Sequence, residues 1–104
     1  MAGHSLGGRD SLVDGIHYLM LAIEQQSPDG VAAWATPIIK DCNRLSTRPL
    51  SGSPPLCECL GIEYACITDL DRRVKTCMRL SARGEWTQAA TEIRGATILG
   101  GEGV

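Results

Sequence analysis

The sequence predicts an all-α protein, either a small bundle or an orthogonal array of about four helices. Apolar residues recur at intervals of three and four along most of the chain, which is the period of an amphipathic helix. No run of alternating apolar and polar residues is long enough to indicate a strand. With 104 residues, of which 43% are hydrophobic, residues 1–104 are predicted to form a single helical domain.

The clearest helix signal covers residues 63–83. Asp69 precedes Arg73 by four residues, and Asp71 precedes Lys75 by four, which is the favourable order for helical ion pairs. No Gly or Pro interrupts the stretch, and Gly84 follows it as a residue suited to the left-handed backbone that ends many helices. Its apolar side consists of Cys66, Ile67, Leu70, Val74, Cys77, Met78 and Leu80.

The first helix is expected to follow a flexible leader, residues 1–10, which contains three Gly. Ser11 is the expected N-cap, with Asp14 in the capping-box position, and the helix should end near Gln26. Apolar residues lie around most of this helix, so little of it is expected to contact solvent. His17 is therefore expected to be a hydrogen-bonded core histidine.

The second helical stretch begins at Asp29-Gly30 and keeps its apolar phase as far as Leu45. Pro37 lies in the middle, where it removes a hydrogen bond and clashes with the preceding turn. Two alternatives are open: one helix runs through with a kink, or a new helix starts at Thr36-Pro37. The apolar phase continues across Pro37 without a shift, which favours a single kinked helix.

The remaining segments are shorter. Residues 47–55, rich in Pro and Ser, are predicted to form a loop. A short helix follows it, and Gly61 either closes this helix or lies within the next one. A last helix is expected from Glu85 to about Gly95, followed by a flexible tail, residues 99–104.

The five Cys and two His predict neither a metal site nor a catalytic site. Structural zinc sites pair their ligands as C-x2-4-C, whereas Cys57 and Cys59 are one residue apart. These two thiols are expected to be exposed beside the loop, while the other three are expected to serve as small hydrophobes in helices. No nucleophile elbow, phosphate loop or metalloprotease motif is present. We therefore expect a protein that is not an enzyme and needs no cofactor.

The sharpest surface feature is a run of cations in the helix 63–83, which is the candidate partner-binding site. Such a run suits an acidic protein surface or nucleic-acid phosphate, but a solvated face balanced by Asp69 and Asp71 explains it as well. Its members are Arg72, Arg73, Lys75, Arg79 and Arg83.

Nucleic acid is the less favoured partner. The junction at Gly84 is similar to a helix-turn-helix corner, but the helix that follows carries Glu85, Gln88 and Glu92 and one Arg94. Acidic residues there would repel phosphate. The net charge of −2 and the pI of about 5.6 give no overall attraction to nucleic acid either.

Trp34 and Trp86 are each in phase with the apolar face of their own helix, so both are expected in the core. Two helices that look apolar nearly all round would nevertheless leave one apolar face for a partner protein, or for a second copy in a homodimer.

These observations predict a small non-enzymatic helical protein that acts by protein–protein binding. A more specific expectation is a phage or mobile-element accessory protein that inhibits a host protein, such as a defence component. The alternative is a small DNA-binding transcriptional regulator that uses the region around Gly84. Five Cys without an export signal indicate a cytoplasmic protein, and the longest apolar run, residues 18–23, is too short to span a membrane.

Overall fold

The computed structural model describes residues 9–99 and is all-α over that range, with no strand. This confirms the predicted fold class. The elements in chain order are α1 (Arg9–Glu24), α2 (Pro28–Ser46), α3 (Leu56–Cys59), α4 (Tyr64–Ala82), α5 (Trp86–Arg94) and a short 3-10 turn, η2 (Thr97–Leu99).

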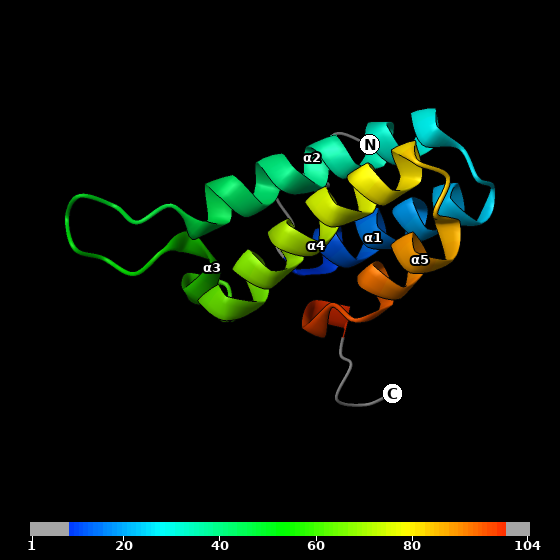
Figure 1. Ribbon diagram of the computed structural model, residues 1–104. Coiled ribbons are helices and arrows are strands. Elements are labelled where there is room, and N and C mark those ends of the chain that lie inside the picture. Colours follow the sequence, from blue (N-terminus) through cyan, green and yellow to red (C-terminus); the bar gives the residue numbers. More distant parts are fainter. Residues whose placement is uncertain (1–8, 100–104) are drawn as a thin grey trace.

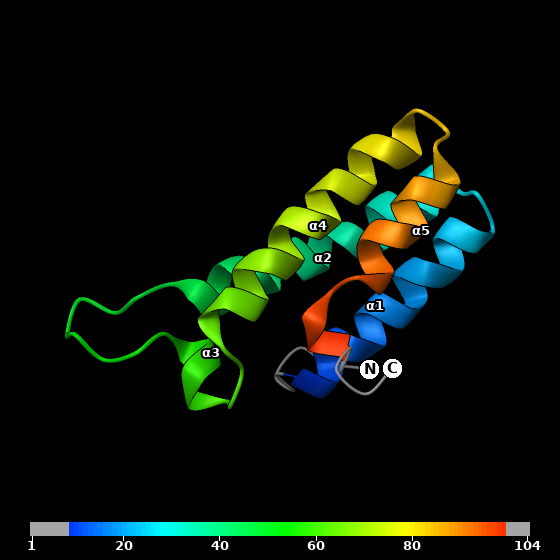
Figure 2. The ribbon, with the colours of Figure 1, turned by 60° about the horizontal axis from the view of Figure 1, so that its bottom comes forward.

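The four long helices form a bundle in which each packs against two others. Helix α1 contacts α2 and α5, and α4 also contacts α2 and α5. Successive long helices run in opposite directions and lie roughly side by side (Figures 1 and 2). The arrangement is therefore an up-and-down bundle rather than an orthogonal array. Because α1 and α4 each pack between α2 and α5, α4 lies diagonally opposite α1 in the bundle.

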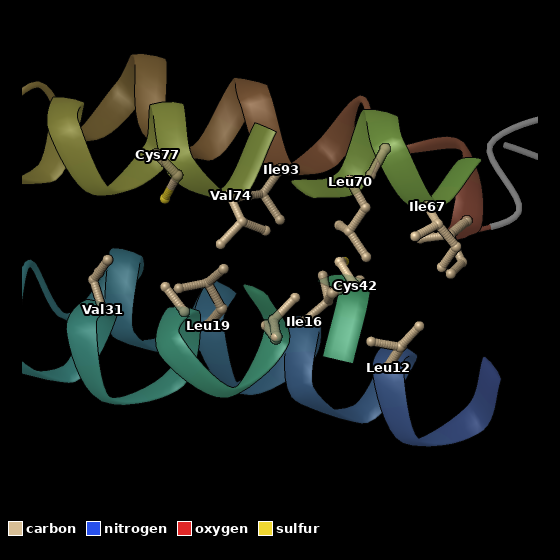
Figure 3. Packing of buried hydrophobic residues seen from close by; sticks show 14 of the residues in the cluster. Leu12, Ile16, Leu19, Val31, Cys42, Ile67, Leu70, Val74, Cys77 and Ile93 are labelled. Carbon is tan, nitrogen blue, oxygen red and sulfur yellow. The ribbon is translucent and has the colours of Figure 1, made fainter. Parts of the chain in front are cut away.

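The bundle closes on an aliphatic core drawn from all four long helices. Leu12, Ile16 and Leu19 of α1 and Val31 of α2 point toward residues of α4 and α5 (Figure 3). Cys42 and Cys77 lie among these residues as small apolar side chains. The buried side of α4 consists of Ile67, Leu70, Val74, Cys77 and Ser81.

Helix α2 runs through Pro37 as one helix, so the alternative of a new helix at Thr36-Pro37 is wrong. The N-cap is Ser27, whose Oγ accepts a hydrogen bond from the Gly30 N–H at 3.0 Å. Pro28 occupies the first turn, where a missing N–H costs nothing. The Pro37 side chain is exposed.

Helix α1 begins earlier than predicted, because it already includes Arg9 and Asp10. Ser11 is therefore inside the helix, and its expected roles as N-cap and as part of a capping box with Asp14 are wrong. Asp10 lies in the first turn, where the helix dipole favours an acid. Residues 1–8 of the expected leader and residues 100–104 of the expected tail lie outside the described residues.

Two glycines end helices as left-handed residues. Gly84 has φ 77°, and the N–H of Glu85 bonds the Leu80 carbonyl at 2.9 Å. Gly61 has φ 81°, and the N–H of Ile62 bonds the Cys57 carbonyl at 2.9 Å. Each pattern is a Schellman motif. Gly61 thus closes α3 and is not part of α4.

The segment 47–55 is not helical and joins α2 to α3. It projects beyond one end of the bundle (Figures 1 and 2). Leu50 at its tip is fully exposed, whereas Pro55 at its end is buried.

Candidate functional site

Four of the five predicted cations form a single row on the solvent side of α4. Arg72, Lys75, Arg79 and Arg83 follow one another at intervals of three and four residues, and all are exposed. We call these four residues the α4 row. Because α4 is diagonally opposite α1, the row faces away from α1.

Acids beside the α4 row already neutralise most of it. Arg72 pairs with Asp69, Lys75 Nζ lies 3.0 Å from Asp71 Oδ2, and Arg83 Nη2 lies 3.2 Å from Glu85 Oε1. Arg79 bonds only the hydroxyl of Thr76, at 3.3 Å, among the described residues. The row therefore has much less unbalanced positive charge than the sequence suggests, and exposed pairs of this kind are individually weak.

Arg73, the fifth predicted cation, lies beside the row and joins two helices. Its Nε lies 2.8 Å from Asp69 Oδ2, and its Nη1 donates to the Glu92 carbonyl of α5 at 3.0 Å. Its side chain is only 24% exposed. The Glu92 carbonyl is in the last turn of α5, where a cation is favourable. Arg73 thus fastens α5 to α4.

The corner at Gly84 offers little positive charge for DNA phosphate. The helix after it, α5, exposes Gln88 and the single cation Arg94, and Glu85 and Glu92 are partly exposed there. The cation nearest in sequence, Arg83, is paired with Glu85.

Three of the five thiols are buried, which suits structural residues rather than nucleophiles. Burial, reinforced by the charges of Asp71 and Asp41, raises the pKa of Cys42 to about 12. Burial likewise raises the pKa of Cys77 and of Cys57. A thiol with a raised pKa is protonated at neutral pH and is a poor nucleophile.

Two expectations about reactive side chains are wrong. Cys57 is buried rather than exposed, because Ile62 and the turn at Gly61 fold α3 onto the bundle; Cys59 is exposed as predicted. His17 is exposed on α1 rather than buried in the core. Neither change creates a catalytic pair in the described part of the chain.

Cys66 lies in a hollow of about 580 Å³ at the start of α4. Its Sγ accepts a hydrogen bond from the Thr97 hydroxyl at 3.3 Å. Glu63, Asp69 and Arg73 also line the hollow, and no histidine of the described part of the chain does. Among residues 9–99, the thiol therefore has no neighbouring imidazole to act as its base.

Within residues 9–99, no three His, Cys, Asp or Glu side chains come together in a group that could hold a metal ion. Over the same range, no helix combines the length and apolar character needed to cross a membrane.

The most distinctive surface lies on the outer side of α1 and α2. Tyr18 of α1 stacks on Trp34 of α2, with ring centroids 4.5 Å apart and an angle of 14° between the rings. Tyr18 is 50% exposed, Leu21 is 49% exposed and Trp34 is 39% exposed. The expectation that Trp34 belongs to the core is therefore wrong, whereas Trp86 is partly buried against the core.

Around this aromatic stack the two helices present further exposed residues. Ala33 and Pro37 of α2 extend the apolar area, and Asp14 of α1 and Lys40 of α2 lie at its edge. We call this the contact face: Tyr18, Leu21, Ala33, Trp34 and Pro37 with the edge residues Asp14 and Lys40. Helical spacing indicated an excess of apolar residues on α1, but only the packing shows which of them remain exposed.

Close approach of α1 and α2 explains why the stack can form. A Cβ atom at Gly15 would lie 3.4 Å from Ile38, and one at Gly30 would lie 3.1 Å from the Cβ of Ala22. These two small residues let the helix backbones come together. Tyr18 and Trp34 then meet across the seam on the outside.

Comparison of the chain with protein-family models, with curated proteins and with solved structures finds no match.

Proposed function

We propose that this chain acts by binding another protein chain, and that the contact face is its principal binding surface. The observation that carries the proposal is the half-exposed Tyr18–Trp34 stack with Leu21 beside it. Tyr and Trp are enriched among the residues that dominate binding energy at protein interfaces. An apolar centre with charged residues at its edge is also the usual anatomy of such a surface.

The α4 row is a second, weaker candidate surface for an acidic partner. Ion pairs between exposed side chains exchange partners at little cost, so its cations could turn from their present acids to those of a bound protein. Arg79 is the best placed of them, since it bonds no acid among the described residues. The DNA-binding alternative has less support, because Arg83, the cation next to Gly84, is paired with Glu85, and α5 carries the acid Glu92 and a single cation, Arg94.

A more specific form of the proposal is that the chain is an accessory protein of a phage or mobile element and blocks a host protein. Affinity capture from the native host tests whether the chain binds another protein and whether that protein comes from the host. The tagged chain should retain a protein that mass spectrometry identifies, and Trp34→Ser should reduce its recovery by about tenfold or more, as loss of a dominant interface residue does.

The matched control is Leu50→Ser, which removes another exposed apolar side chain far from the contact face. This variant should capture the same protein as the wild type. Circular dichroism of each variant establishes that it is folded. Equal recovery by the wild type and by a folded Trp34→Ser variant would count against the contact face.

A further inference from the structure

We infer that the contact face binds a second copy of this chain in a twofold dimer, with each α1 lying over α2 of the other copy. The inference rests on the proposed function, since it names the occupant of the same face.

The geometry of the face is suited to pairing with itself. Asp14, Tyr18 and Leu21 follow one another on α1 at intervals of four and three residues, and Ala33, Pro37 and Lys40 do so on α2. Each set therefore forms a stripe along the outside of its own helix. The two stripes run side by side, separated by the seam, which is the line between α1 and α2 where Tyr18 stacks on Trp34. A twofold axis along that seam lays the α1 stripe of one copy over the α2 stripe of the other.

The charges at the edge of the face are complementary under the same symmetry. Asp14 and Lys40 have no hydrogen-bond or ion-pair partner among the described residues. Because Tyr18 lies opposite Trp34 in antiparallel helices, Asp14 and Lys40 lie at the same end of the seam, only about 3 Å apart along the helix axis at 1.5 Å per residue. The twofold axis brings each Asp14 opposite Lys40 of the other copy, so two ion pairs form.

The α4 row lacks this self-complementarity. A twofold contact through that row would place cations opposite cations, which is unfavourable. Among the described residues, the other exposed large aliphatic side chains outside the contact face, Leu50, Leu56 and Leu60, lie in the loop 47–55 and in or just after α3. On the contact face, a second copy can place apolar groups on apolar groups and unlike charges on unlike charges.

The test is charge reversal followed by mixing, with the dissociation constant measured by sedimentation over a dilution series. The wild type should form dimers. Asp14→Lys and Lys40→Glu should each weaken the dimer by about tenfold or more, because each places like charges opposite one another twice. The doubly reversed chain should recover dimerisation.

An equimolar mixture of the two single variants provides the sharper measurement. In its heterodimer the introduced lysine lies opposite the introduced glutamate, and the unchanged Lys40 lies opposite the unchanged Asp14. The mixture should therefore associate although each variant alone is mainly monomeric. An effect within one chain could not produce this rescue. Glu24→Lys changes an exposed charge outside the contact face and should leave dimerisation unchanged.

A monomeric wild type, or a dimer that is indifferent to both reversals, would overturn the inference. If the wild type is monomeric but captures another protein in a Trp34-dependent manner, the dimer is wrong and the proposed function stands. If it is monomeric and nothing depends on Trp34, both are wrong.

Discussion

Gln26 holds a left-handed backbone conformation at the end of α1, with φ 52°. It is the C′ residue of a Schellman motif, because the Ser27 N–H bonds the Ala22 carbonyl at 3.1 Å. This conformation costs a non-glycine residue roughly 1–2 kcal/mol. Glycine avoids that cost, but it loses more backbone entropy on folding, which offsets part of the gain. Gln26→Gly should therefore raise the free energy of unfolding by about 0.5–1 kcal/mol.

Chemical denaturation measures this gain, and Gln25→Gly is the matched control. Gln25 does not have a positive φ, so glycine there should lower the stability. A Gln26→Gly variant that is less stable than the wild type would contradict the assignment of the left-handed residue.

The buried thiol of Cys42 should make the fold sensitive to alkaline pH. Its pKa rises from the ordinary 9.0 to about 12 on folding. Below pH 9 the thiol is protonated in both states, whereas between pH 9 and pH 12 the unfolded chain binds fewer protons than the folded one. The free energy of unfolding therefore falls as pH rises through this range.

Urea unfolding across this pH range tests the effect by comparison of variants. The alkaline loss of stability should be smaller in Cys42→Ala, which has no thiol to ionise at this position. Cys59→Ala removes an exposed thiol and serves as the control. An equally steep loss in Cys42→Ala would rule out Cys42 as the source.

At the scale of single residues, the sequence predicts which side chains are buried in some cases and not in others, for a physical reason. Cys42 and Cys77 follow the apolar phase of long helices and are buried as predicted. Cys57 lies in a four-residue helix with too few turns to define a face, and its burial depends on how α3 packs against α2 and α4. Trp34 is in helical phase with the core, but its ring stacks on Tyr18 at the surface instead.

At the scale of elements, the junction between α4 and α5 depends on Arg73. Its guanidinium bonds Asp69 and the Glu92 carbonyl at the end of α5. Arg73→Met should lower the free energy of unfolding by about 1–2 kcal/mol, the range for a partly exposed hydrogen bond to a charged group. Arg72→Met, in the exposed α4 row, should change it by less than about 0.5 kcal/mol. Chemical denaturation compares the two variants, and equal losses would contradict the role of Arg73.

Gly95 supplies the room that Arg73 needs. A Cβ atom there would lie 2.6 Å from Arg73 Nη1, although the φ of −78° suits any residue. Gly95→Ala should therefore destabilise the wild type by displacing the guanidinium, but be neutral or stabilising in Arg73→Met. A double-mutant cycle by denaturation should give a coupling energy of about 0.5 kcal/mol or more. Additive effects would show that the two residues do not interact.

The type of an element is predictable from the sequence wherever the helical pattern of apolar residues continues over several turns. The continuous phase across Pro37 indicated a single helix, and α2 is one helix. The start of α1 was not predictable, because its first turn is polar and Ser11 offered a capping signal that the chain does not use. The role of Gly61 also needed the structure, since both alternatives satisfied local preferences.

At the scale of the whole molecule, stability depends on the core between α4 and the other helices. Leu70 is fully buried there, and Leu70→Ala should cost roughly 2–5 kcal/mol. Thr76 lies on the outer side of α4, so Thr76→Ala should change the free energy of unfolding by less than about 0.5 kcal/mol. Denaturation of the two variants tests the helix register, and similar losses would contradict it.

The contact face could be predicted only in part. The sequence shows that α1 has more apolar residues than one packed face can hold. It does not show that α1 and α2 meet closely at Gly15 and Gly30, which sets Tyr18 against Trp34 on the outside. For the cations of α4, the sequence predicts one run of five that includes Arg73; the long-range contact that ties Arg73 to α5 cannot be read from local sequence.

The central claim is that the contact face of α1 and α2 meets another protein chain. The most direct measurement places a photo-crosslinking amino acid at Leu21 and, separately, at Leu50, and irradiates each tagged chain in the native host. Leu21 is exposed on the contact face, and Leu50 is exposed at the tip of the loop. We expect a discrete crosslinked protein, either a second copy or a different chain, from position 21 and none from position 50. Equal or absent crosslinking at both positions would contradict the claim.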